Sequence, residues 1–467
     1  MNFYFEAAKT LDRLDSKQGS IKGVLASLPE KNRKRTTALV IETLKYKVVL
    51  TDIIEEAKLL KEERKITSLN LALVLVHDLL LSGGIQAGDG PVKQAILRHK
   101  TRLHGELQKI KIKRGVKTDT ELAQTADPRA ARIPRHVRVN TLIWSTDEAV
   151  KSLMSQGFIV SDPFESETSF MRDKHIPDLL SFSPRVTFHD DPLYTAGKII
   201  LQDKASCFPA TVLAPPANDN TFVIDATSAP GNKTSHLSAL MKNKGKLFAF
   251  ERDKKRFTTL TTMLSRAGCR NVEPINADFL TVHPLDPKYS RVTHILLDPS
   301  CSGSGIVNRL DHLLETEIED DGDQEDRLKR LASFQVMMVK HAMRFPGVQK
   351  IVYSTCSIHA TENEHVVLES LRSESKVGPF ALASPNEVLP QWPRRGLSKE
   401  MEPPNSAASV VRCSPGEDAT NGFFVSCFIR ARTSSDKRKT DTFESDIDVS
   451  DVSHNKKKKK GRRNNTS

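Results

Sequence analysis

The chain has 467 residues, of which 38% are hydrophobic and 27% charged, so it is long enough for two or three globular domains and is not disordered as a whole. Its 70 Lys and Arg against 58 Asp and Glu leave a net charge of +12, which favours partners that carry phosphate groups. Six cysteines without a CxxC pair, no signal-peptide pattern at the start and no run of about 18 apolar residues argue against a disulfide framework and a membrane span. We therefore expect a soluble intracellular protein with no membrane partner and no metal.

Residues 1–116 are predicted to form a helical domain. Apolar residues recur at three- and four-residue steps over residues 37–53 and 69–81, which is the period of helices with one buried face. Between Arg98 and Lys117, basic residues outnumber acidic ones by eight to one. This basic run is either a solvated helix face or a surface that follows a phosphate backbone, and both interpretations stay open.

A polar stretch over residues 117–132 is typical of a linker. After it, residues 134–215 are predicted to form a small α+β unit, which begins with a strand at 134–142 and continues with a helix at 147–156. The mixture of short strands with a single short helix is what indicates this class.

Residues 216–432 are predicted to form a Rossmann-like α/β domain. Short β-type runs at 221–224, 247–250, 294–297 and 351–353 alternate with helical segments, a pattern that indicates a parallel sheet with helices on both faces. In such folds ligands bind beyond the carboxyl ends of the strands, so the polar residues that follow each strand are candidates for a site.

Two segments depart from this pattern. The acidic run over residues 315–326 is predicted to be a solvated insertion loop, and residues 433–467 a disordered basic tail. The tail ends in five lysines followed by Gly-Arg-Arg, which resembles a nuclear or nucleolar address, and a non-specific electrostatic tail is the alternative.

The first strand of the α/β domain leads into a glycine turn, Asp-Ala-Thr-Ser-Ala-Pro-Gly-Asn-Lys-Thr at residues 225–234, and then into a helix. Such a junction lets the backbone approach a ligand closely, although a Pro-Gly turn without a ligand would look the same. The next three strands lead into Glu251, Asp278 and Asp298, and a carboxylate such as Glu251 can accept hydrogen bonds from a ribose diol. The G-x-G-x-x-G fingerprint of dehydrogenases and the P-loop are absent, so an adenosine-bearing cofactor without a pyrophosphate fits best.

Two cysteines complete the candidate site. Cys301 follows the fourth strand in Asp-Pro-Ser-Cys-Ser-Gly-Ser-Gly, and Cys356 follows the fifth in Tyr-Ser-Thr-Cys-Ser. A buried core cysteine is the usual alternative, but two thiols at equivalent strand ends favour a chemical role. Methylation of C5 of cytosine requires a thiolate that adds to C6, a carboxyl group at N3, and a base that later removes the C5 proton.

In this order, the motifs resemble those of the RNA cytosine-C5 methyltransferases of the NOL/NOP/Sun-domain (RsmB-like) family, over about residues 137–429. The resemblance implies a class I S-adenosylmethionine-dependent methyltransferase domain, with residues 134–215 as an RNA-binding segment. It also implies that Cys356 is the nucleophile, that Cys301 helps to release the product, and that Asp298 contacts the base near N3. The S-adenosylmethionine pocket would be lined by Thr227, Ser228, Ala229, Pro230, Gly231, Asn232, Lys233, Glu251, Arg256, Asp278 and Asp298.

The chain departs from the family at one point of the glycine turn. Where many members have Cys-Ala-Ala-Pro-Gly-Gly, residues 227–232 are Thr-Ser-Ala-Pro-Gly-Asn, and we expect the turn to survive because Asn tolerates left-handed backbone geometry. The helical start and residues 229–237 are most similar to the large-subunit (28S-type) ribosomal RNA methyltransferases. That similarity implies an unstacked cytosine of ribosomal RNA as substrate, pre-ribosomal particles as partners, and the nucleus and nucleolus as the location.

Two other functions stay open at this point. A tRNA cytosine-C5 methyltransferase would have the same motifs, and an rRNA-binding assembly factor could keep the fold without useful catalysis. Methylation of a protein or a small molecule is disfavoured because it needs no pair of thiols, and Cys301 with Cys356 is the discriminating feature.

Overall fold

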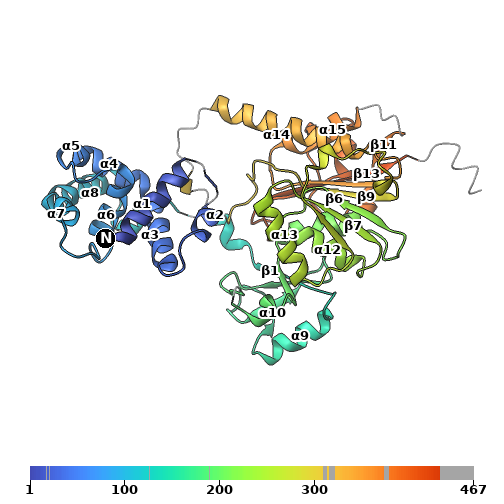
Figure 1. Cartoon of the computed structure of the whole chain (residues 1–467), viewed down its shortest axis with the longest axis horizontal. Coiled ribbons are helices and arrows are strands. Elements are labelled where there is room, and N and C mark those ends of the chain that lie inside the picture. The colour runs from blue at the N-terminus through green and yellow to red at the C-terminus, as the bar shows by residue number, and fades with distance from the viewer. Residues whose placement is uncertain are drawn as a thin grey trace, which may run out of the picture.

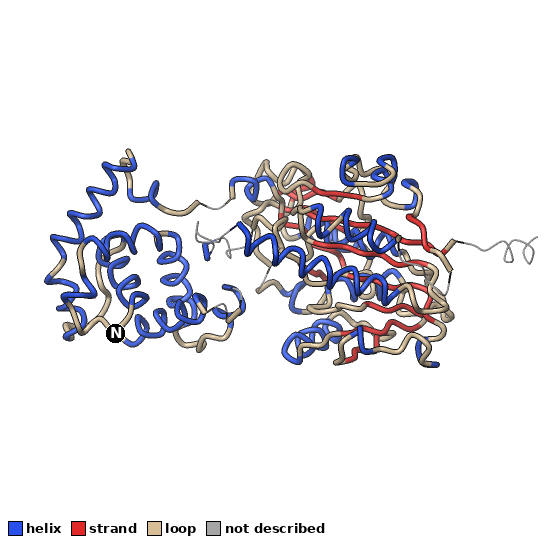
Figure 2. Tube along the Cα trace, turned by 90° about the horizontal axis from the view of Figure 1, so that it is seen from above, coloured by secondary structure: helices blue, strands red, loops and turns tan. Residues whose placement is uncertain are grey.

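The structure, a computed structural model of the whole chain, describes residues 1–16, 18–19, 21–125, 127–188, 190–308, 313–314, 321–372 and 378–431. The chain forms three units: a helical unit on the left of Figure 1, a large α/β unit on the right, and a small α+β unit below the large one. Figure 2 shows that the strands gather in the two units on the right, while the unit on the left is built from helices. Among the described residues, no helix is both long and apolar enough to cross a membrane.

The helical unit confirms the prediction of helices at the start of the chain. Its helices are α1 (Asn2–Asp15), α2 (Ile21–Ala26), α3 (Arg33–Lys45), α4 (Lys47–Glu56), α5 (Leu59–Glu62), α6 (Leu69–Leu81), α7 (Pro91–Arg98) and α8 (Lys100–Arg114). The predicted run at 37–53 covers parts of two helices, because the backbone leaves helical geometry at Tyr46, with φ −110° and ψ 9°. Helix α6 is buried on every side from Asn70 to Leu80, so it is the centre of the unit rather than an amphipathic surface helix.

The basic run between Arg98 and Lys117 is largely paired inside this unit. Five of its eight cations lie within 4 Å of carboxylates: Arg98 with Glu63, Arg102 with Glu62, Lys109 with Glu106, Lys111 with Asp119, and Arg114 with Asp52. Pairs of this kind contribute little stability each, but they neutralise charge that would otherwise face a partner. The structure therefore favours the solvated helix face over a continuous phosphate-binding surface.

The predicted linker contains two 3₁₀ turns, η1 (Asp119–Leu122) and η2 (Pro128–Arg132). The second turn packs on the large unit at Gly416, where a Cβ atom would lie 2.7 Å from the carbonyl oxygen of Arg129. This part of the linker is therefore docked on the large unit.

The small unit combines a five-stranded sheet with a ten-residue helix and a four-residue helix. Its elements are β1 (Arg135–Val139), α9 (Thr146–Ser155), β2 (Ile159–Val160), β3 (Ser169–Arg172), β4 (Leu179–Phe182), α10 (Pro192–Thr195) and β5 (Ile199–Leu201), with strand order β2-β3-β4-β1-β5. The strand predicted at 134–142 and the helix predicted at 147–156 are both present. Phe158, Phe170, Phe182 and Phe188 form the aromatic centre of its core.

The large unit is a doubly wound sheet, as predicted. Its path runs β11-β13-β10-β9-β6-β7-β8, in which β6 to β10 are parallel and β13 is antiparallel to β10. The strands are β6 (Phe222–Asp225), β7 (Lys246–Phe250), β8 (Val272–Ile275), β9 (Val292–Leu297), β10 (Lys350–Thr355), β11 (Phe380–Leu382), β12 (Val411–Cys413) and β13 (Phe423–Arg430). Because β6 lies between β7 and β9, the winding direction reverses there, and such a reversal is where ligands bind in these folds.

Helices cover both faces of this sheet. They are α11 (Lys204–Leu213), α12 (Asn232–Leu240), α13 (Lys254–Arg266), α14 (Asp321–Ala342) and α15 (Glu364–Leu371), with a 3₁₀ turn, η6 (Ala360–Glu362), just before α15. Side chains of β9 alternate between the two cores: Ile295 and Leu297 pack on the side of α14 and α15, and Leu296 packs on the side of α11 and α12. Strand β9 is therefore covered on both faces, as its apolar sequence requires.

The insertion between β9 and α14 differs in part from the prediction. Residues 321–326 of the acidic run form the first turns of α14, so the expected loop is wrong there. Glu325 and Asp326 are exposed to solvent, but they lie on a helix. Residues 315–320 and the predicted tail at 433–467 lie outside the described residues. Leu313, from the same insertion, is buried in the core of the helical unit.

The small unit is joined to the large one through buried polar groups. Arg138 of β1 is 1% exposed, and it donates to Gln202 Oε1 at 2.7 Å and to Ser235 Oγ of α12 at 2.8 Å. Asn140 donates to the carbonyl oxygens of Gly197 and Ala267, both at 2.8 Å. Arg138 is thus a structural residue of the junction and does not face solvent.

Candidate active site

The loop between β6 and α12 is held at both ends by Asp225. The Thr227 N–H donates to Asp225 Oδ1 at 3.3 Å, and Thr234 Oγ1 donates to Asp225 Oδ2 at 2.7 Å. Burial raises the pKa of Asp225 to about 6. Gly231 has φ 115°, and a Cβ there would lie 3.0 Å from Met263 Cγ, so this turn requires glycine.

The sequence predicts that Asn232 adopts left-handed backbone geometry in this turn, but the turn does not require it. The left-handed residue is Gly231, and Asn232 is the first residue of α12. The Asn232 side chain instead donates to the carbonyl oxygen of Leu201 at 3.3 Å, which ties the helix start to the small unit.

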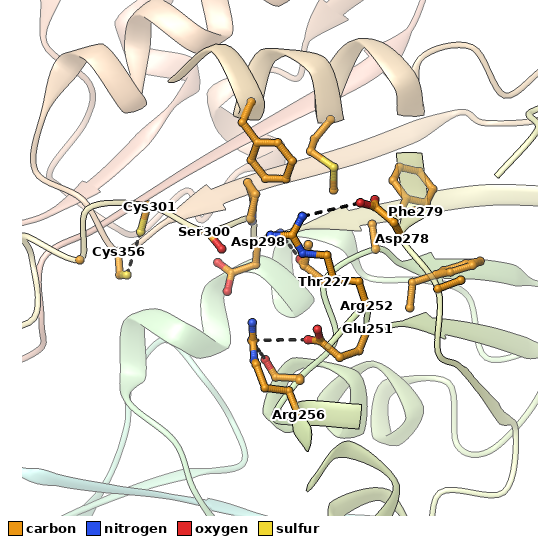
Figure 3. A pocket seen from close by; sticks show the side chains of 18 residues that line it. Thr227, Glu251, Arg252, Arg256, Asp278, Phe279, Asp298, Ser300, Cys301 and Cys356 are labelled. Carbon is orange, nitrogen blue, oxygen red and sulfur yellow. Dashed lines mark hydrogen bonds and ion pairs between the residues drawn. The ribbon is translucent and has the colours of Figure 1, made fainter. Parts of the chain in front are cut away.

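A cavity of about 310 Å³ opens at the carboxyl ends of the parallel strands (Figure 3). It is lined by Ala226, Thr227, Ala229, Phe250, Glu251, Arg252, Arg256, Ala277, Asp278, Phe279, Asp298, Pro299, Ser300, Cys301, Gly303, Phe334, Met338 and Cys356. The structure thus brings eight predicted site residues to one cavity: Thr227, Ala229, Glu251, Arg256, Asp278, Asp298, Cys301 and Cys356.

The other predicted cofactor residues do not line this cavity. Ser228 is buried and donates to the carbonyl oxygen of Asp225, and Gly231 forms the turn. Pro230 and Asn232 line a separate groove beside α13. Lys233 points toward Asp298 instead. The loop therefore presents only part of its length to the cavity.

Two carboxylates suit an adenosine-bearing cofactor. Glu251 is buried, with Oε2 3.6 Å from the Arg256 guanidinium, and Figure 3 shows Asp278 on the next strand end beside it. Phe279 and Met338 give the same end of the cavity an apolar wall. A carboxylate that accepts from a ribose diol next to an apolar slot for a purine fits these residues, so the donor set is suited to such a group.

Asp298 forms the polar centre of the other end. Its Oδ2 lies 2.8 Å from Lys233 Nζ, its Oδ1 accepts from Ser354 Oγ at 2.7 Å, and its N–H donates to Thr227 Oγ1 at 2.9 Å. Burial lowers the pKa of Lys233, but the Asp298 carboxylate outweighs this, so the pKa is raised and Lys233 stays a cation.

The two predicted thiols are in contact. Cys301 and Cys356 follow neighbouring parallel strands, β9 and β10, and their Sγ atoms are 3.0 Å apart. The hydrogen bond with Cys356 and burial raise the pKa of Cys301 well above its usual value. Cys301 is therefore a neutral thiol at neutral pH, able to donate a hydrogen bond to a sulfur that carries negative charge.

Sequence reasoning missed the apolar side of the cavity. Phe334 and Met338 come from α14, one helical turn apart, and Phe279 follows directly after Asp278. The four-residue spacing of Phe334 and Met338 was the available signal, since it puts both on one helix face. Among the described residues, no cluster of three or more His, Cys, Asp or Glu side chains could hold a metal ion.

Three family models match successive parts of the chain. The N-terminal domain of NOL1/NOP2/Sun domain family member 5 matches residues 34–123, and the ferredoxin-like domain of the same family member matches residues 133–202. The 16S rRNA methyltransferase RsmB/F model matches residues 210–429. These matches follow the helical, small and large units in order.

The chain is 45% identical over 426 residues to the 25S rRNA (cytosine-C(5))-methyltransferase rcm1 of Schizosaccharomyces pombe, covering 91% of this chain and 90% of that protein. It is 44% identical over 444 residues to the 28S rRNA (cytosine-C(5))-methyltransferase of Mus musculus, covering 92% and 91%. The crystal structure of PH0851 shares the fold, with a TM-score of 0.59 and 21% identity over 86% of this chain and 91% of that one.

Fold and site together define a methyltransferase with a doubly wound catalytic domain. The chain belongs to the NOL1/NOP2/Sun-domain family of RNA cytosine-C5 methyltransferases, in the branch that contains these two relatives.

Proposed function

We propose that this enzyme transfers a methyl group from S-adenosylmethionine to C5 of a cytosine in large-subunit ribosomal RNA. The observation that carries the proposal is the pair of thiols, 3.0 Å apart, at the strand ends that border the cavity. The names of the yeast and mouse relatives support ribosomal RNA as the substrate. The target cytosine has to leave its stack to reach these sulfur atoms, so an unpaired or flipped base is expected.

Cys356 is proposed as the nucleophile. Its sulfur adds to C6, a C6–S bond forms, and the electron pair of the C5–C6 double bond becomes available at C5. Asp298 stands beside both thiols in the cavity and would bind the base at N3, while the Lys233 cation adjoins Asp298 and favours negative charge on the Cys356 sulfur. S-adenosylmethionine, when bound, supplies the electrophilic methyl group that C5 takes up.

Cys301 is proposed to act in release. After methylation a base removes the C5 proton, the C5–H electron pair restores the double bond, and the C6–S bond breaks with its pair on Cys356. Cys301 holds its proton on Sγ, 3.0 Å from the departing sulfur, and stabilises it by a hydrogen bond. The raised pKa of Cys301 argues for this role over that of a thiolate base.

The cofactor would occupy the remaining end of the cavity. We propose that Glu251 accepts from its ribose and that Asp278 contacts its adenine, beside Phe279. Arg256 would act through Glu251 and through its hydrogen bond to the carbonyl oxygen of Ala229, which helps to shape the loop.

The first test is bisulfite sequencing of total rRNA and tRNA from cells in which Cys356→Ala replaces the wild type. We expect the loss of one large-subunit rRNA mark, and in vitro a protein–RNA adduct that persists with Cys301→Ala and is absent with Cys356→Ala. Equal behaviour of the two variants would contradict the division of roles.

Other outcomes would select the alternatives. Loss of a tRNA mark would keep the chemistry and change the substrate, whereas no loss at any cytosine would favour an rRNA-binding assembly factor. With pre-ribosomal particles as partners, the protein is expected in the nucleus and nucleolus, and a fluorescent fusion examined by microscopy checks this location.

A further inference from the structure

The two cysteines are held by two consecutive residues at the end of η6, of which Glu362 is its last residue and Asn363 follows it. Glu362 and Asn363 are both fully buried, and each contacts the segment around one of the thiols. We propose that they, together with Gln335 of α14, form a clamp that sets the separation of the Cys301 and Cys356 sulfur atoms. The name thiol clamp is used below for Gln335, Glu362 and Asn363.

One half of the thiol clamp holds Cys301. Glu362 Oε1 accepts the N–H of Ser302 at 2.9 Å, and Gln335 Nε2 donates to the carbonyl oxygen of Ser300 at 3.0 Å. The peptide groups on both sides of Cys301 are therefore fixed. Gln335 Nε2 also donates to Glu362 Oε1 at 3.0 Å, so the two side chains support each other.

The orientation of the Gln335 amide is set by its partners. Both contacts of Nε2 are acceptors, while Oε1 lies 3.0 Å from the Tyr353 hydroxyl, which shares its single proton between this oxygen and the carbonyl oxygen of Glu362. A flipped amide would face two acceptors with its oxygen, which is unfavourable. Gln335 is fully buried, and its amide has one arrangement in this site.

The other half of the thiol clamp holds Cys356. Thr355 Oγ1 donates to Asn363 Oδ1, and Asn363 Nδ2 donates to the carbonyl oxygen of Ser357 at 3.0 Å. Asn363 thus binds the residues on both sides of Cys356. Because Glu362 and Asn363 are joined by one peptide bond, movement of either thiol segment relative to the other strains the thiol clamp.

The burial of Glu362 indicates that this arrangement has a use beyond packing. Among the described residues, its Oε2 has no hydrogen-bond partner and no cation lies within ion-pair distance. A buried carboxyl group without a cation costs free energy compared with an apolar residue of the same shape. A function that needs Oε1 at that position would explain the cost.

The thiol clamp rests on the proposed function and extends it to residues that touch neither substrate nor cofactor. The contacts to the Cys301 segment should affect the release of the methylated RNA, and the contacts to the Cys356 segment should affect the addition of Cys356 to the base. A misplacement of about 1 Å far from the reacting atoms can slow a step on the order of a hundredfold, so loss of these contacts is expected to be measurable. Gln335, Glu362 and Asn363 are positioning residues in this scheme.

The test uses full-length variants and two readouts. The probe is fragmented, end-labelled large-subunit rRNA from cells that lack this protein, assayed with methyl-tritiated S-adenosylmethionine. Gln335→Met is expected to raise the denaturation-stable protein–RNA adduct about tenfold, as Cys301→Ala does, with single-turnover methylation within about twofold of wild type. Asn363→Leu is expected to lose adduct and methylation together.

Two matched variants serve as controls. Glu362→Gln keeps the Oε1 acceptor and should behave like wild type. Ser426→Ala removes a buried hydroxyl that has no hydrogen-bond partner in the part of the chain that the structure describes. It lies on β13 directly opposite Tyr353, and the variant should also be unchanged. Melting curves of all variants check that they are folded.

The proposal is overturned if Gln335→Met and Asn363→Leu share one phenotype, or if both behave like Ser426→Ala. Should Gln335→Met not fold, Tyr353→Phe removes the hydroxyl that contacts both the Gln335 amide and the carbonyl oxygen of Glu362, and unchanged adduct levels in it would overturn the Cys301 half. Cys301→Ala and Cys356→Ala in the same assay distinguish a failure of the proposed function from a failure of the thiol clamp. The absence of adduct in both variants would refute the covalent mechanism itself. Adduct in Cys301→Ala, together with no effect of Gln335→Met, would refute the thiol clamp.

Discussion

Asp225 is buried at the end of β6, where it accepts hydrogen bonds from Thr227 and Thr234 and, among the described residues, has no cation within ion-pair distance. Its folded-state pKa of about 6 exceeds the ordinary 3.8, so the folded protein holds a proton that the unfolded chain loses. The stability that this difference contributes is present below about pH 4 and is lost as the pH rises through 6.

Asp225→Asn should therefore stabilise the protein above pH 6. Asn can accept from the Thr227 N–H and donate to Thr234 Oγ1, which can turn its proton to the Ser228 carbonyl oxygen. We expect a gain on the order of 1–3 kcal/mol at pH 7 and almost none at pH 4. Denaturant melts of both proteins at the two pH values measure it, and an equal difference at both would contradict the assignment.

Among single residues, the sequence predicted those that directly follow the carboxyl end of a parallel strand. Cys301, Cys356 and Asp298 could be placed because a parallel sheet brings the ends of its strands together. Gln335 and Glu362 could not, since a single Gln in a long helix or a Glu before one is normally solvated, and only the tertiary structure brings them to the thiol segments.

The junction of the small and large units depends on the close approach of two turns. Gly197, before β5, has φ 70°, and a Cβ there would lie 2.1 Å from the carbonyl oxygen of Arg266 at the end of α13. Gly268, two residues after α13, has nearly the same φ, 69°, but open space around it. A comparison of alanine substitutions at the two glycines therefore separates the cost of backbone strain from the cost of steric contact.

Gly197→Ala should destabilise the protein much more than Gly268→Ala. The left-handed backbone costs each variant about 1–2 kcal/mol, and the contact with Arg266 adds about 1–3 kcal/mol in Gly197→Ala alone. Differential scanning fluorimetry of the two variants compares them. Equal shifts in the melting temperature would mean that the units can separate at this point without cost.

Whole elements were predicted better than their ends. The strands β6, β7, β9 and β10 have apolar runs that burial on both faces explains, and they were predicted within a few residues, whereas β11, β12 and β13 were not predicted. The start of α14 was not found, because its acidic first turns have no apolar period. The break at Tyr46 was hidden for the opposite reason, since the apolar period continues from α3 into α4.

For the whole molecule, Leu313 links the catalytic and helical units. It belongs to the insertion that follows the Cys301 segment, and it is 4% exposed within the core of the helical unit. Leu313→Asp should lower the melting temperature of that unit, because a buried carboxylate replaces apolar packing at a cost of about 2–5 kcal/mol. Leu285→Asp, at a leucine that is 67% exposed, is the matched control and should change nothing.

The helical unit is consequently attached at two places, through the chain that continues into the docked η2 turn and through Leu313. Attachment of this kind is bivalent: while one connection holds, the other faces its partner at an effective concentration on the order of millimolar, and it re-forms after each opening. A single proteolytic nick in the linker would therefore leave the two parts together, and they would come apart only when both connections are lost.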